Sequence, residues 1–309
     1  MDKKNRYIIG SSIVAIALLT LAPYFIPLYW MAFLFFCFIY LVLTEMWVLV
    51  AGFTGMVLLG IGGFVGIGAY SFVIFSTCLN WPLWPSLILS GIIGVIIALA
   101  VSSTIFRMRG AYFAMSTLVI ANALFAWFST WSYTGGGAGI VVNVKLPIAI
   151  VYHIALILAF ASIIIVTFVV RSNLGLMLKA IGSDEDAALT VGVNTYTCKL
   201  YCFLIASFMI SLAGAIYFLY PGFVTPDAAF SPIWLINTLT AASVGGWTNI
   251  GGAIIGVIFI ITLQQFFYVN YPGLSMLING IIIVVIFLIS PRGLWPAIRS
   301  LIEKRLKRF

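Results

Sequence analysis

Long apolar runs separated by short polar connections make up almost the whole chain. Runs of about 20 apolar residues recur, which is the length that crosses a bilayer as an α-helix, and the alternation typical of a membrane β-barrel is absent. We therefore predict an all-α fold, a polytopic transmembrane helical bundle formed by a single domain, residues 1–309. About ten spans are predicted, at residues 8–29, 31–52, 54–78, 84–105, 112–131, 148–170, 200–220, 231–247, 251–270 and 273–290. Glycines interrupt residues 30–66 repeatedly, which leaves a re-entrant or broken helix open as the alternative there.

The longest polar interruption inside the chain is residues 171–199, between the sixth and seventh predicted spans. Ser183 is suited to cap a helix that begins at Asp184, because acidic residues complement the positive end of the helix dipole. Gly192 is suited to end this helix, so we predict about two turns from Asp184 to Val191. A helix this short depends on packing for its stability, against its own protein or a partner.

Composition and charge place the chain in a membrane and orient it. Apolar residues make up 64% of the chain and charged residues only 7%, with a mean hydropathy of +1.22, which excludes a water-soluble fold. The net charge of +8 comes from short basic patches between spans, a pattern that marks topology and does not indicate nucleic-acid binding.

An even number of spans puts both termini on one side, and nearly all the basic residues fall on that side, whereas Lys145 falls on the other. The termini and the loop 171–199 are therefore predicted to be cytoplasmic, in a bacterial-type inner membrane. The basic residues on the predicted cytoplasmic side are Lys3, Lys4, Arg6, Arg107, Arg109, Arg171, Lys179, Lys199, Arg292, Arg299, Lys304, Arg305, Lys307 and Arg308.

Glu45 is the one acid predicted within a span. A charge in the membrane costs about 2.5 to 3.5 kcal/mol on insertion scales, so Glu45 is either part of a solute path or an interfacial or paired residue. The glycine-rich stretch 52–70 leaves a similar choice, because small residues allow close helix packing and their exposed backbone can also line a path. The candidate path glycines are Gly52, Gly55, Gly60, Gly62, Gly63 and Gly66.

Two segments predicted to lie outside the membrane are candidates for contact with an extracytoplasmic partner. One is the loop 134–140, where Gly135 and Gly136 serve either as a flexible turn or as docking amides. The other contains Asp227, which follows a proline and is either a turn residue or a partner contact.

Several kinds of chemistry are missing from the chain. No Gly-Lys dipeptide occurs, so the chain has no phosphate-binding loop for a nucleotide. Paired intramembrane carboxylates are also absent, which argues against an enzyme. His153 is the only histidine and the cysteines form no CxxC pair, so no metal site is predicted.

Four blocks of the chain carry a resemblance to a known family: residues 52–70, 107–140, 171–194 and 245–296. With these blocks in order, the chain resembles the LivM-type permeases of branched-chain amino acid ABC importers. ABC importer permeases carry an E-A-A-x-x-x-G signature on a cytoplasmic coupling helix, and residues 186–192, DAALTVG, match it with Asp186 in place of Glu. The resemblance thus implies that a coupling site includes Ser183, Asp184, Glu185, Asp186, Ala187, Ala188 and Gly192.

The resemblance implies a transport subunit that imports branched-chain or other small amino acids. It also implies a second, LivH-like permease, two cytosolic ATPase subunits that hold ATP and magnesium, and an extracytoplasmic solute-binding protein. This chain itself is expected to bind no cofactor. Urea or another amide stays open as the solute, as does a homodimer or heterodimer of permeases. Outside the family, the alternative is a stand-alone secondary transporter or channel built around Glu45.

Overall fold

The computed structural model describes residues 18–247 and 250–270, together with positions 277, 280, 281 and 284. The predicted span 273–290, residues 8–17 of the predicted span 8–29, and most of the terminal basic residues lie largely outside these described residues. The described part of the span 8–29 is not one helix, so this prediction is wrong: the helical residues end at residue 21, a 3₁₀ turn follows at Ala22–Tyr24, and the next helix begins at Leu28, directly after Pro27. Within them, six helices are long and apolar enough to cross a membrane, so the polytopic helical bundle is confirmed. These six are Leu28–Gly52, Ile61–Cys78, Leu83–Ile105, Ala111–Thr130, Ile148–Arg171 and Thr195–Leu219.

Two of these spans are separated by a break, which lies within residues 30–66, where the sequence left a broken helix open. Helix α2 (Leu28–Trp47) continues through the π-helical turn η2 (Val48–Gly52), and residues 55–60 are not helical. Helix α3 (Ile61–Val73) then begins and continues through a second π-helical turn, η3 (Ile74–Cys78). The prediction of a helix from residue 54 is therefore wrong by about two turns.

The other long helices lie close to their predicted ranges. Prolines stand immediately before two of them, where a missing N–H costs nothing. The last one begins five residues earlier than predicted, because the Asn194 side chain caps it by accepting a hydrogen bond from the Thr197 N–H. These helices are α4 (Leu83–Ile105), α5 (Ala111–Thr130), α6 (Ile148–Arg171) and α9 (Thr195–Leu219).

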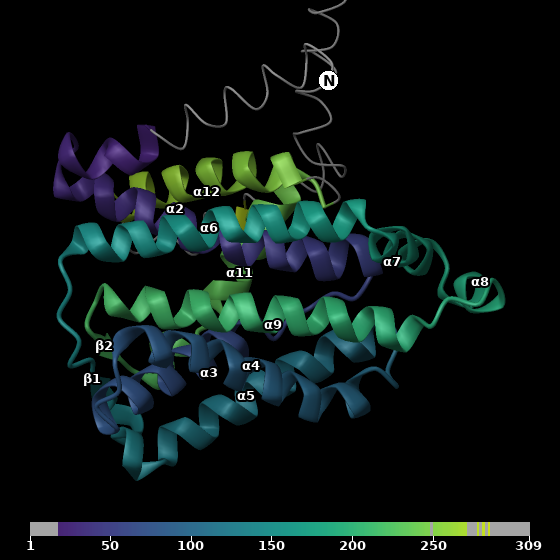
Figure 1. Cartoon of the computed structure of the whole chain (residues 1–309), viewed down its shortest axis with the longest axis horizontal. Helices are drawn as coiled ribbons and strands as arrows, with labels where there is room; N and C mark the ends of the chain where they lie inside the picture. Colours follow the sequence, from purple (N-terminus) through teal and green to yellow (C-terminus); the bar gives the residue numbers. More distant parts are fainter. Residues whose placement is uncertain (1–17, 248–249, 271–276, 278–279, 282–283, 285–309) are drawn as a thin grey trace, which may run out of the picture.

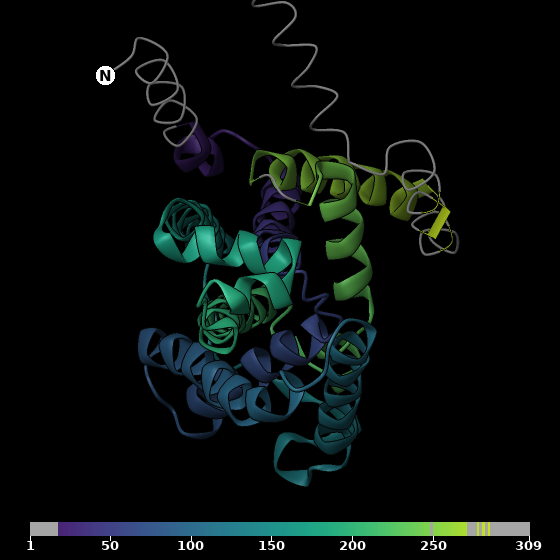
Figure 2. The same ribbon diagram turned by 90° about the vertical axis from the view of Figure 1, so that its right-hand side faces the viewer.

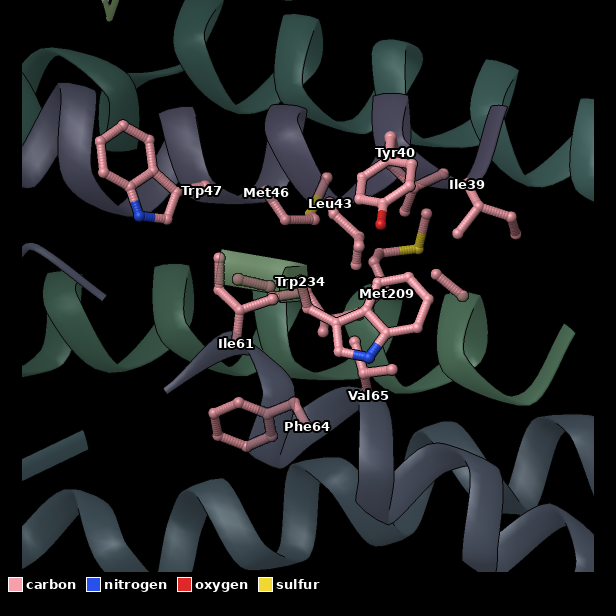
Figure 3. Close-up of a cluster of buried hydrophobic side chains, with 14 of the residues drawn as sticks. Ile39, Tyr40, Leu43, Met46, Trp47, Ile61, Phe64, Val65, Met209 and Trp234 are labelled. Atoms are coloured by element: carbon pink, nitrogen blue, oxygen red, sulfur yellow. The ribbon is translucent and has the colours of Figure 1, made fainter. Parts of the chain in front are cut away.

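Helices α2, α3 and α9 are mostly buried, whereas α4, α5 and α6 lie on the outside of the bundle (Figures 1 and 2). Glycine allows α3 and α9 to touch through their backbones: a Cβ on Gly68 would lie 1.9 Å from the Ser211 carbonyl oxygen, and one on Gly214 2.3 Å from that of Val65. Large side chains of α2, α3 and α9 fill the remaining space, with Trp234 added from α11 (Figure 3).

Helices α11 (Ile233–Gly245) and α12 (Ile250–Asn270) follow as a hairpin. Gly246, at φ +99°, ends α11, and the backbones cross so closely that a Cβ on Gly245 would lie 2.0 Å from the Gly252 carbonyl oxygen. The 13 residues of α11 extend only about 20 Å, less than a bilayer core. The predicted span 231–247 is therefore too long at both ends.

The short elements collect at the two ends of the bundle. Strands β1 (Ile140–Val141) and β2 (Phe223–Val224) pair at one end, beside α10 (Pro226–Ala229) and the short 3₁₀ turns η4 (Ser132–Thr134) and η5 (Gly136–Ala138). Helices α7 (Asn173–Ser183) and α8 (Glu185–Thr190) project from the opposite end (Figure 1). A further 3₁₀ turn, η1 (Ala22–Tyr24), precedes α2.

Candidate functional site

The polar interruption folds into two helices, where the sequence predicted one. The predicted cap was off by one residue: Asp184 caps α8, its Oδ1 accepting hydrogen bonds from the Asp186 N–H at 2.9 Å and the Ala187 N–H at 3.0 Å. The Ser183 hydroxyl instead donates to the Lys179 carbonyl, because Ser183 is the last residue of α7. Helix α8 is thus six residues long, shorter than the predicted range.

Gly192 ends α8 as predicted. Its φ of +87° is the left-handed conformation that glycine adopts at a helix C-terminus, and the Val193 N–H reaches back to the Ala188 carbonyl at 3.1 Å. The turn leaves apolar side chains in the open: Leu189 is 46% exposed and Val191 84%. Exposed apolar groups on a short polar helix are typical of a surface that binds a partner.

Two ion pairs hold α8 on the rest of the chain. Glu185 pairs with Lys199 of α9 at 2.5 Å, and the Lys199 side chain is only 10% exposed. Asp186 pairs with Arg109, in the loop before α5, at 3.0 Å, but both of these side chains are mostly exposed. The first pair is therefore the stronger contribution to the position of α8, since solvent screens the second.

Replacing Lys199 with Met tests this difference. The change leaves the half-buried Glu185 carboxylate without its cation. We therefore expect the free energy of unfolding to fall by about 2 kcal/mol, less than for a fully buried pair. We also expect uptake to fall several-fold. Thermal unfolding of the purified chain and uptake into membrane vesicles measure the two effects.

The matched control is Arg109→Ala, which should change uptake less than about twofold, because exposed ion pairs contribute little. The double variant Lys199→Met, Glu185→Leu should regain most of the lost stability, because it leaves no unpaired charge. If the double variant loses as much stability as Lys199→Met alone, the Glu185–Lys199 ion pair does not hold α8 in place.

The corner between α7 and α8 rests directly on the break between α2 and α3. A Cβ on Gly182 would lie 2.5 Å from the Phe53 carbonyl oxygen, and one on Gly55, at φ +73°, would lie 3.9 Å from the Gly182 Cα. The Lys179 ammonium lies 5.9 Å from the centre of the Phe53 ring. Because these contacts are direct, a displacement of α7 and α8 would also displace residues 53–55.

Side chains from elsewhere satisfy the backbone of the break. The Trp47 indole N–H donates to the Leu58 carbonyl at 3.0 Å. The Thr117 hydroxyl of α5 accepts from both the Leu59 and Gly60 N–H groups at 3.2 Å. Non-helical backbone at membrane depth is tolerated only where protein or a water-filled cavity satisfies it, so these bonds explain how the break persists.

A cavity of about 50 Å³ separates the break from α8. Both signs of charge border it, from Lys199, Arg109 and Glu185, and backbone from residues 54–56 forms another wall. The remaining lining comes from Phe106, Met108, Gly110 and Phe113. The α8 helix, the break and a polar cavity thus occupy one end of the bundle.

The glycines predicted to line a path lie mainly at tight contacts within the chain. At five of the six candidates a Cβ would come within about 3 Å of a neighbouring element. Their role in a path is not tested by this geometry and stays a prediction. The contacts are Gly52 with the Trp247 carbonyl, Gly60 with Thr117, Gly63 with Ala121, and Gly62 and Gly66 with Phe230.

Glu45 lies in α2 and is fully buried. Among the described residues, neither carboxyl oxygen has a hydrogen-bond partner, and the adjacent Thr44 hydroxyl is also buried without one. Whether Glu45 lies at the membrane interface or in the solute path stays a prediction. A buried acid without a partner is costly, and in membrane proteins such residues mark functional sites.

The two predicted partner-binding segments meet at the end of the bundle opposite α8. Gly135 and Gly136 both have positive φ, +77° and +54°, in the turn that leads to β1. Asp227 lies in the first turn of α10, directly after β2. Pairing of Ile140 with Val224 brings these segments together, a proximity that no local sequence pattern indicated.

Sequence reasoning missed three residues of the α8 end: Gly182, Lys199 and Thr117. Helix α7 itself had a signal, because Leu174, Leu178 and Ile181 repeat with the spacing of a helix face. The contacts of the three missed residues are long-range and left no such signal.

The described residues thus form a helical membrane bundle with a break between two spans and a short polar helix resting on it, an arrangement that suits a transport permease. The family model described as "Branched-chain amino acid transport system / permease component" matches residues 29–287. The chain belongs to this permease family, which makes it a multi-pass transport subunit.

Two curated relatives are both the high-affinity branched-chain amino acid transport system permease protein LivM. The one from Salmonella typhimurium is 25% identical over 293 residues, covering 84% of this chain and 68% of the relative. The one from Escherichia coli is 24% identical over 294 residues, with the same coverage. No solved structure matches the chain significantly.

Proposed function

We propose that this chain is a permease subunit of an ATP-driven importer that moves branched-chain or other small amino acids across the cytoplasmic membrane. The observation that carries the proposal is the contact of the α7–α8 corner with residues 53–55, where the break begins. Broken helices are typical of transporters, and this one lies at the α8 end of the bundle. A helix that contacts such a break is well placed to move it.

In this proposal α8 is the coupling helix. Its exposed Leu189 and Val191 dock on a cytosolic ATPase subunit, and Glu185 passes the motion to α9 through Lys199. Gly182 passes it to the break. Because a packed interface switches between discrete arrangements, a small shift of α8 is enough to favour one state of the break over another.

The proposed partners follow from the family and from the two ends of the bundle. Two ATPase subunits supply ATP and magnesium, one for this chain and one for a second, LivH-like permease. An extracytoplasmic binding protein delivers the solute to the end that holds Gly135, Gly136 and Asp227. This arrangement places both termini and the 171–199 loop in the cytoplasm, as the distribution of basic residues predicts.

Reconstitution tests the function. Liposomes that hold this chain with its second permease and ATPases should accumulate leucine only when ATP and the binding protein are supplied. Valine and isoleucine should compete with leucine, whereas urea should not. Uptake of urea in preference to leucine, or uptake by this chain alone driven by an ion gradient, would contradict the proposal.

The substitution Glu45→Gln tests whether Glu45 belongs to the path. Glutamine has nearly the same shape and removes the ionisable group, so we expect normal assembly. Uptake should fall by about tenfold if the carboxylate meets the solute ammonium in another conformation, the loss of roughly one charged hydrogen bond. Leucine uptake and the amount of assembled complex measure the two effects.

The neighbouring Thr44→Val is the control, because Thr44 is equally buried without a partner but carries no charge. Uptake by the Glu45→Gln complex at the normal rate would remove Glu45 from the path.

A further inference from the structure

Most of the outer surface of the bundle is suited to lipid. On α4 the exposed side chains near the middle of the span are Ile88, Ile92 and Ile96. On α6 they are Ile157 and Ile164. Branched aliphatic groups of this kind are what the hydrocarbon core of a bilayer favours.

Helix α5 differs. Asn122, near the middle of its 20 residues, is exposed, and so are Ala123 and Ala126 on the same side. Within the part of the chain that the structure describes, the Asn122 amide has no hydrogen-bond partner. An amide at this depth that faced only lipid would leave its donors and acceptor unsatisfied.

The other side of α5 holds the break between α2 and α3. The Thr117 hydroxyl accepts from the Leu59 and Gly60 N–H groups, and Ala121 lies against Gly63, where a Cβ would be 3.1 Å from the Ala121 Cβ. Asn122 directly follows Ala121. One helix therefore fixes the non-helical backbone with one face, and the Asn122 amide near its mid-span is exposed away from that face.

We infer that the α5 strip formed by Asn122, Ala123 and Ala126 borders the water-filled path of the solute. The inference rests on the proposed function and identifies one of the helices that line the solute path. The small alanines leave room beside the helix, and the amide offers a donor to a carboxylate and an acceptor to an ammonium group, as a zwitterionic amino acid requires. Contact with the break favours water over a simple helix interface, because breaks of this kind accompany solute paths.

Cysteine labelling in the complete transporter tests the inference. Asn122→Cys is expressed with the partner subunits in membrane vesicles and treated with the membrane-impermeant anion 2-sulfonatoethyl methanethiosulfonate. Thiolates form only in water, so Asn122→Cys should react about tenfold faster than the mid-span controls Ile92→Cys and Ile157→Cys. Leucine in excess should slow the reaction, and the unsubstituted chain gives the background from its four natural cysteines.

Ala126→Cys on the same face provides a second position if the complex with Asn122→Cys does not assemble. Reaction at the rate of the lipid-facing controls would overturn the inference. So would low reactivity accompanied by a disulfide crosslink to another subunit, which would make the face a dry interface. ATP-driven leucine uptake by the unsubstituted complex is measured in parallel, so failure of the proposed function is distinguished from failure of the path assignment.

Discussion

Replacing Gly182 with Val is expected to reduce uptake by about tenfold while leaving the transporter assembled. A Cβ at this position would lie 2.5 Å from the Phe53 carbonyl oxygen, a backbone atom that yields only if the break or the end of α7 moves. Overpacking of this kind costs about 1 to 3 kcal/mol, enough to shift a balance between two states by about tenfold or more. ATP hydrolysis by the complex should continue, because α8 itself is unchanged.

The measurement is the ratio of leucine molecules taken up to ATP molecules hydrolysed in reconstituted liposomes. The ratio should fall by about tenfold for Gly182→Val, in line with the overpacking energy. The matched control is Ala180→Val, which adds the same side chain at an exposed position of the same helix. Equal losses in both variants would attribute the effect to α7 in general and not to its contact with Phe53.

The sequence was sufficient to predict the class of fold and the ends of most spans. Hydrophobic length identifies a membrane helix almost without competition, since the bilayer forces the backbone to satisfy its own hydrogen bonds. The termination of α8 at Gly192 was likewise readable, because a left-handed residue after a helix strongly favours glycine.

The sequence left a broken helix open within residues 30–66, but the position of the break at residues 55–60 could not be predicted in this way. Its residues are apolar and glycine-rich, so they match a tightly packed helix as well as an extended segment. The extended conformation is stabilised by hydrogen bonds from residues outside the segment, because the side chains of Trp47 and Thr117 satisfy its backbone groups. The one-residue error at the cap of α8 has a local cause, because Ser183 and Asp184 are both good capping residues.

Part of the candidate site was likewise predictable from the sequence, and part was not. The acids of α8 were identified from a short motif, whereas their partners Lys199 and Arg109 lie far along the chain. Ion pairs between loops leave no periodic trace in a sequence. The candidate path residues Glu45 and the glycines were found from their unusual chemistry, but only a state with an open path would show whether they line it.

In the proposed mechanism, α8 is the contact through which an ATPase drives the break between α2 and α3. Co-purification of the ATPase subunits with variants of Val191 tests this contact most directly, because the Val191 side chain is 84% exposed and a change there disturbs little of the described structure. The account predicts that Val191→Asp loses the ATPase subunits while the second permease stays bound, and that Val191→Ile retains both. Undiminished recovery of the ATPase subunits with Val191→Asp would contradict it.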